Sequence, residues 1–172
     1  MISGIEKADI SDFDSILKLY RMAILEHKKA GIVQWDDEYP SAITLKENII
    51  ANHTWVIRSD QNIAATVTLD TDQDPQYDAI QWAYPSEKIL VIHRLCVNPS
   101  LQGNGLAKKI IAFAEAFAYD NSFEVIRLDA FLGNSYSQRL YQNLGYHEAI
   151  GYCYYPPDQI MCNCFEKRIV LL

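Results

Sequence analysis

The chain has 172 residues and a formal net charge of −7, and 49% of its residues are hydrophobic. This length suits one domain that buries its core without disulfides or a structural metal, so we expect a single domain over residues 1–172. Nucleic-acid-binding proteins usually present a basic face, so the acidic balance argues against DNA or RNA as a partner. The N-terminus lacks a signal-peptide pattern, and no apolar run approaches the roughly 20 residues of a membrane helix. We therefore expect a cytoplasmic protein with no membrane partner.

The chain contains four cysteines. Cys162 and Cys164 lie two positions apart, but the C-x-x-C pair that is typical of zinc sites is missing. In a reducing cytosol all four should be free thiols. We expect them to pack in strands as small hydrophobic residues, and we expect no metal.

The first part of the chain predicts a strand, two helices and a hairpin. A strand is expected over residues 2–7. Ser11 is the expected N-cap of the first helix, which ends near Gly31, and a second helix is expected over about 41–51. Two apolar stretches follow, and the polar turn between them is typical of an antiparallel hairpin. They cover residues 54–58 and 63–69.

The second part predicts strands and helices in alternation. Residues 70–86 are polar with aromatics and are expected to form an elaborated loop, and the apolar strand 88–97 is expected to be buried on both faces. A helix with a wide apolar stripe is expected from Gly103 to Tyr119. The later elements are a strand over 123–130, a helix over 134–143 ended by Gly145, and strands over 146–154 and 161–170. This order predicts an α/β domain with a mixed sheet and helices on both faces.

The segment VNPSLQGNGLA, residues 97–107, carries the main functional motif. An apolar strand ends there, a glycine-containing loop turns, and a helix begins. Backbone N–H groups at a helix N-terminus are unpaired, and Gly103 and Gly105 allow a ligand to approach the backbone closely. These features predict a pyrophosphate site. The Lys-Ser/Thr of a P-loop and the third glycine of a dinucleotide fingerprint are missing, and a plain tight turn remains the alternative.

Gln102-x-x-Gly105-x-Ala107 resembles the acetyl-CoA signature of the GNAT superfamily of N-acetyltransferases, Q/R-x-x-G-x-G/A. The segment NSYSQRLYQNLGY, residues 134–146, is similar to the family's second conserved block, although Ser137 stands where alanine is common. The resemblance is specific between about residues 88 and 150. It implies a GNAT-like mixed, mostly antiparallel sheet of about six to seven strands, flanked by helices on both faces.

The resemblance also implies acetyl-CoA as co-substrate. The pantetheine arm would bond to backbone near the end of the apolar strand, where a backbone N–H can also polarise the thioester carbonyl. The pyrophosphate would lie on N–H groups of the loop, and the Asn134 amide would hold the pantetheine arm. The residues implied in cofactor binding are Leu95, Cys96, Val97, Gln102, Gly103, Asn104, Gly105, Leu106, Ala107, Asn134 and Ser137.

Two catalytic residues follow from the same resemblance. Tyr141 matches the family's thiolate-protonating tyrosine; the alternative is a helix tyrosine that packs its ring on the sheet. Several family members carry a glutamate base where this chain has Val91. His93 shares the strand face of Val91 if no bulge intervenes, and its ordinary pKa suits a base. It would otherwise be a core histidine or a CoA contact. Glu87, acting through water, is a further candidate.

Aromatic residues are the candidates for acceptor binding. Trp35 and Tyr39 flank an acidic stretch that would suit an ammonium group, or they form a hydrophobic staple before the second helix. Tyr77 and Trp82 would line the cleft or cover the sheet edge. All four are retained as substrate-binding candidates.

The sequence thus predicts transfer of an acetyl group from acetyl-CoA to a primary amine on a small molecule, by direct attack in a ternary complex. Three alternatives stay open: a non-catalytic acyl-CoA-binding or regulatory module, an acyltransferase that uses a longer acyl-CoA or a protein amine, and a flavodoxin-like binding domain. An exposed C-terminal strand would support a homodimer, which nothing in the sequence specifies.

Overall fold

The computed structural model describes residues 2–36, 38–60, 62–155 and 160–170. The chain falls into two compact units. Unit 1 comprises the residues up to 69 together with 93–113, and unit 2 comprises 70–92 together with the chain from 114 onward. Strand β4 (Ile89–Val97) and helix α3 (Leu106–Asp120) contribute to both units. The seven strands follow the order β1-β2-β3-β4-β5-β7-β6. A single domain over the whole chain stays a prediction.

Unit 1 contains the first three strands and the first two helices. These elements are β1 (Ile2–Lys7), α1 (Phe13–Lys29), α2 (Ala42–Ile50), β2 (Thr54–Ser59) and β3 (Asn62–Asp70). Strand β2 pairs antiparallel with both β1 and β3. The expected strand, the second helix and the hairpin are confirmed.

The start of the first helix differs from the prediction. Asp9, rather than Ser11, is the N-cap: its carboxylate accepts from Ser11 N, and Asp12 accepts from Asp9 N in a capping box. A 3₁₀ turn over Ile10–Asp12 therefore precedes α1. The prediction failed because two good cap residues lie two positions apart, each with an acidic residue three positions on, and the structure forms the capping box of the earlier one.

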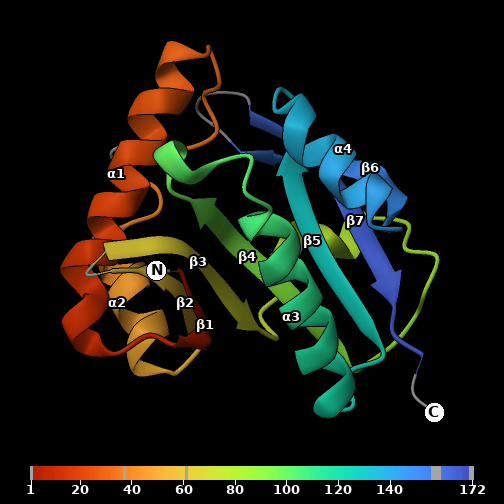
Figure 1. Ribbon diagram of the computed structural model, residues 1–172. Helices are drawn as coiled ribbons and strands as arrows, with labels where there is room; N and C mark the ends of the chain where they lie inside the picture. Colours follow the sequence, from red (N-terminus) through yellow and green to blue (C-terminus); the bar gives the residue numbers. More distant parts are fainter. Residues whose placement is uncertain (1, 37, 61, 156–159, 171–172) are drawn as a thin grey trace. The chain divides into compact units, whose positions relative to one another are not determined.

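The core of unit 1 lies between its strands and the helices α1 and α2, which run beside β1–β3 in Figure 1. The buried side chains include Ile16, Tyr20, Trp35, Leu45, Val56 and Cys96. On β2, Trp55 precedes the inward-facing Val56 and points to the opposite face, where its ring lies 4.7 Å from that of Phe113 on α3. Helices α1 and α2 therefore pack on one face of these strands and α3 contacts the other, as expected.

Helix α3 begins later than predicted. Gly103 and Gly105 have φ angles of +82° and +75°, which a right-handed helix does not contain. They form a loop after the 3₁₀ turn Pro99–Leu101, and the helix begins at Leu106. The wide apolar stripe of this helix is confirmed by the burial of Ile110, Ile111, Ala114 and Ala118.

Unit 2 contains β5 (Val125–Phe131), α4 (Ser135–Asn143), β6 (His147–Tyr155) and β7 (Ile160–Arg168). Strand β5 pairs parallel with β4 and antiparallel with β7, and β7 pairs antiparallel with β6. Figure 1 shows α4 beside these strands, and Gly145 follows its end at φ +80°. The mixed, mostly antiparallel sheet is confirmed, and it excludes the flavodoxin-like alternative, which needs mostly parallel strands.

The expected loop over residues 70–86 is held by a buried ion pair in unit 2. A 3₁₀ turn covers Pro75–Ala79. The Glu166 carboxylate accepts from the backbone N–H groups of Ala83 and Tyr84. Arg127 Nε lies 3.8 Å from Glu166 Oε2, and its guanidinium lies 4.2 Å from the Trp82 ring centroid. The loop is therefore tied to β5 and β7.

The four cysteines are buried free thiols on strands, which confirms their expected packing. Cys153 and Cys164 lie on neighbouring strands with their Sγ atoms 3.4 Å apart. Among the described residues, no group of three or more suitable side chains could hold a metal ion. In the same part of the chain, no helix has the length and apolar character needed to cross a membrane.

Candidate functional site

The candidate site in unit 1 begins at a backbone irregularity in β4, at Arg94, which we interpret as a β-bulge. Arg94 has φ +52°, in the left-handed region that arginine rarely adopts. The buried Tyr20 hydroxyl on α1 donates to the Arg94 carbonyl at 2.6 Å. This long-range hydrogen bond fixes the irregular backbone. Irregularities of this kind in strands are common next to functional sites.

The bulge separates His93 from the strand residues expected to bind the cofactor. Side-chain alternation is interrupted at Arg94, so the faces of residues 95–97 do not follow from that of His93. His93 is half-buried, as are Leu95 and Val97, whereas Cys96 is buried in the unit 1 core. Burial raises the pKa of the Cys96 thiol, which suits a packing residue and not a nucleophile.

The loop after β4 is open on its outer side. Gln102, Gly103, Asn104 and Gly105 are exposed, and a Cβ added at either glycine would meet no protein atom within 4 Å. The Asn104 side chain donates to the Leu101 carbonyl and fixes the turn. The positive φ angles at both glycines explain why these residue types stand there.

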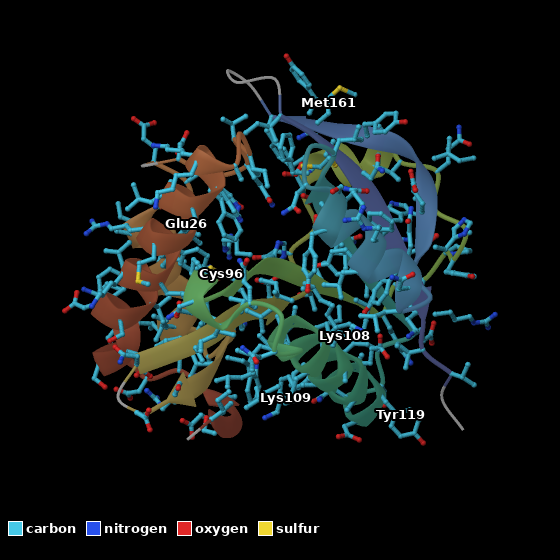
Figure 2. The ribbon with its side chains drawn as sticks, turned by 45° about the horizontal axis from the view of Figure 1, so that its top comes forward. Glu26, Cys96, Lys108, Lys109, Tyr119 and Met161 are labelled. Atoms are coloured by element: carbon cyan, nitrogen blue, oxygen red, sulfur yellow. The ribbon has the colours of Figure 1, made fainter. Side chains whose placement is uncertain are left out.

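The start of α3 supplies the electrostatics of this loop. Leu106 and Ala107 are buried and anchor the first turn. The first four N–H groups of a helix have no intrahelical partner and carry partial positive charge. Lys108 and Lys109, labelled in Figure 2, are exposed on the same turn. An anion is therefore favoured at this end of α3, within unit 1.

The candidate residues on α4 in unit 2 form a helix cap. The Asn134 side-chain oxygen accepts from Ser137 N at 3.3 Å, and the Ser137 hydroxyl donates to the Asn134 carbonyl at 2.9 Å. The cap uses the oxygen of the Asn134 amide. A role toward a ligand would therefore fall to its nitrogen.

Tyr141 lies in the core of unit 2. Its ring centroid is 5.7 Å from those of Tyr146 and Phe165. Burial raises the pKa of its hydroxyl, and the nearby Asp129 charge raises it further. The hydroxyl is therefore protonated throughout the neutral range, which an acid requires, but the packing also fits a purely structural tyrosine.

The two candidates before α2 differ in exposure. Trp35 is buried, with its ring 5.3 Å from Tyr20 in an edge-to-face contact, whereas Tyr39 is 49% exposed. The Asp36 carboxylate accepts from the backbone N–H groups of Glu38 and Tyr39, so it stabilises the turn. Asp37, one of the three carboxylates of this acidic stretch, lies outside the described residues.

Tyr77 and Trp82 come together in unit 2. The buried Tyr77 hydroxyl donates to Asp129 at 2.9 Å, and the Trp82 indole donates to the Tyr77 carbonyl at 3.0 Å. The Tyr77 hydroxyl and the Trp82 indole N–H are therefore both used in hydrogen bonds within the protein. Their role in substrate binding stays a prediction.

Comparison with known proteins assigns the family. The model of the Acetyltransferase (GNAT) family matches residues 16–146, which include the loop at 102–107 and Tyr141. The chain belongs to the GNAT acetyltransferase family. The resemblance deduced from the two motifs is thereby confirmed, and with it the family's use of acetyl-CoA.

Individual relatives of this GNAT protein are distant. It is 27% identical over 127 residues to the "Uncharacterized N-acetyltransferase YesJ" of Bacillus subtilis strain 168. That match covers 71% of this chain and 64% of the relative, which is just under two thirds of its length.

Solved structures share the fold at lower identity. The Streptococcus agalactiae GNAT acetyltransferase has a TM-score of 0.81 and 24% identity, covering 97% of this chain and 95% of that one. The protein yncA of Salmonella typhimurium, solved with its cofactor acetyl-CoA, has a TM-score of 0.71 and 15% identity, covering 99% of this chain and 95% of that one.

Sequence reasoning missed several residues of this GNAT protein that shape the two candidate regions. Tyr20 was not among the candidate residues, yet its hydroxyl donates to the Arg94 carbonyl in β4. Asp129 accepts a hydrogen bond from the Tyr77 hydroxyl, and the pair of Arg127 and Glu166 holds the loop over residues 70–86. A charged residue at an inward position of an apolar strand was the one available sign of the buried pair.

Proposed function

We propose that this protein transfers the acetyl group of acetyl-CoA to a primary amine on a small molecule, by direct attack in a ternary complex. The observation that carries the proposal is the exposed glycine loop at residues 102–105 before α3. It leaves open space where backbone N–H groups could receive a pyrophosphate. The family assignment supports the same cofactor.

In the proposed reaction, the acceptor ammonium first loses a proton to a base. The free amine then attacks the thioester carbonyl and gives up its second proton, which restores the proton donor; the C–S bond breaks, and the departing CoA thiolate takes a proton. We assign that proton to the Tyr141 hydroxyl, which burial keeps protonated at neutral pH. His93 is the proposed base, and Glu87 acting through water is the alternative.

We favour a small-molecule acceptor over a protein amine because the sequence shows no basic or extended segment suited to peptide recognition. The reaction is tested by mixing the protein with acetyl-CoA and a panel of polyamines, amino acids, aminoglycosides and peptides while free CoA thiol is followed. Amine-dependent thiol release supports the proposal. Acetyl-CoA binding without turnover of any amine would favour a binding module.

Replacing Gly105 by alanine is expected to weaken acetyl-CoA binding at least about tenfold, because the new Cβ would project where the ligand approaches the backbone. Alanine at this positive φ should also lower the free energy of unfolding by about 1–2 kcal/mol relative to the wild type. Calorimetric titration with acetyl-CoA measures the first effect, and urea denaturation the second.

Gly31→Ala is the matched control for Gly105→Ala. Gly31 has φ +72° and equally open surroundings, but it lies after α1. It should lose similar stability and keep the wild-type acetyl-CoA affinity. Equal affinity losses in the two variants would show that loop 102–105 is not the ligand site.

A further inference from the structure

Arg94 is half-buried, and its charge has no ion-pair partner among the described residues. Its Nε atom is buried without a hydrogen-bond partner, and the guanidinium makes no ion pair with any described residue. A buried donor is normally paired, since leaving it unpaired is unfavourable. An arginine held in this state suggests that its partner is a ligand.

The neighbours of Arg94 come from α1 and the segment after it. Tyr20 donates its hydroxyl to the Arg94 carbonyl at 2.6 Å. Burial raises the pKa of Tyr20, and the Arg94 charge opposes that shift, so the guanidinium lies near the tyrosine hydroxyl. The nearby Cys96 and Tyr39 side chains also raise the pKa of Tyr20.

A second unpaired nitrogen belongs to the same cluster. Trp35 bridges Tyr20 and His27, with ring centroids 5.3 and 5.8 Å away. His27 Nδ1 is buried without a partner, and burial lowers the pKa of this imidazole, which is therefore neutral at physiological pH. We call Tyr20, His27, Trp35 and Arg94 the Arg94 cluster. It combines one cation, one neutral polar nitrogen and two aromatic rings.

We propose that Arg94 binds a carboxylate of the acetyl acceptor, so that the acceptor is an amino acid or a similar amine that carries a carboxylate. This rests on the proposed function. A guanidinium matches a carboxylate in two parallel hydrogen bonds, and aromatic rings suit the aliphatic part of such a molecule. In a chain of net charge −7, an anionic acceptor needs a dedicated cation.

Acetyl-CoA is the other source of anionic groups, and the surroundings of Arg94 argue against it. The glycine loop assigned to the pyrophosphate follows the 3₁₀ turn Pro99–Leu101 at the end of β4. The other members of the Arg94 cluster instead come from α1, which carries Tyr20 and His27, and from Trp35 after that helix. The experiment therefore measures acetyl-CoA affinity and acceptor preference separately.

The test compares amino acids with the amines left when the α-carboxylate is removed: L-phenylalanine with phenethylamine, L-lysine with cadaverine, and L-leucine with isoamylamine. Values of kcat and KM are measured from thiol release at saturating acetyl-CoA. The wild type should prefer the carboxylated member of at least one pair by about 10–100-fold in kcat/KM, the effect expected of a charged hydrogen-bonded pair. Arg94→Gln should abolish the preference by raising KM for that member alone.

Controls separate specificity from folding and from cofactor binding. Arg94→Lys keeps the charge without the planar fork and should recover part of the preference. Arg21→Gln removes an exposed arginine of α1 and should change neither member of a pair. Circular dichroism checks folding, and calorimetry should give the same acetyl-CoA Kd for wild type and Arg94→Gln.

The assignment is overturned if the wild type turns over amines without preferring a carboxylate. It is also overturned if Arg94→Gln weakens both members of a pair equally, or weakens acetyl-CoA binding by the same factor. A wild-type protein that does not bind acetyl-CoA would instead refute the proposed function, and the calorimetric titration reveals this before any acceptor is added.

Discussion

Replacing Arg127 by methionine is expected to lower the free energy of unfolding by about 3–5 kcal/mol, because it leaves the Glu166 carboxylate buried without its counter-charge. The Glu166 and Arg127 side chains are 0% and 8% exposed. Arg127 also donates to Gln73 and to the Tyr84 carbonyl. Urea denaturation followed by fluorescence and circular dichroism measures the change, and coincident curves show a single transition.

A double variant separates the charge from the packing. Glu166→Gln keeps an oxygen that can accept from Ala83 and Tyr84, so adding it to Arg127→Met should recover at least about half of the loss. Arg139→Met, at an exposed position on α4, should stay within about 0.5 kcal/mol of wild type. A double variant no more stable than Arg127→Met would rule out the unpaired charge as the cause.

Tyr141→Phe is expected to lower the kcat of amine-dependent thiol release at least about tenfold while leaving the acetyl-CoA Kd unchanged. Phenylalanine keeps the ring between Tyr146 and Phe165 and removes only the proton donor. Steady-state kinetics and calorimetry measure the two quantities. A Tyr141→Phe enzyme with the wild-type rate would show that this residue only packs against the sheet.

Tyr136→Phe is the control, since it removes a hydroxyl that is exposed on the same helix. The pH profile adds a further check. Burial raises the pKa of Tyr141 above its ordinary value near 10, so the acid form persists below that pH. The wild-type kcat should therefore show no alkaline decline attributable to Tyr141 below about pH 10.

The parts of the fold that the sequence predicted well depend on local patterns. Strand β1 and the β2–β3 hairpin follow from apolar runs and polar turns, and α4 ends where Gly145 permits φ +80°. The glycine loop before α3 was located by its motif. The start of α3 was placed too early because the sequence does not reveal that Gly103 and Gly105 adopt positive φ angles.

The features that escaped prediction depend on distant partners. The left-handed Arg94 has no local cause and is held by Tyr20, 74 positions away in the sequence. The contact between Tyr77 and Asp129 spans 52 positions. Sequence periodicity reports which face of an element is apolar, and it does not report which polar groups meet across the fold.

The central claim is tested most directly by calorimetric titration of acetyl-CoA into the wild-type protein. We predict saturable binding of one acetyl-CoA per chain, weakened by Gly105→Ala and unchanged by Gly31→Ala. Absence of saturable binding to a protein whose circular dichroism shows it to be folded would contradict an acetyl-CoA-dependent function.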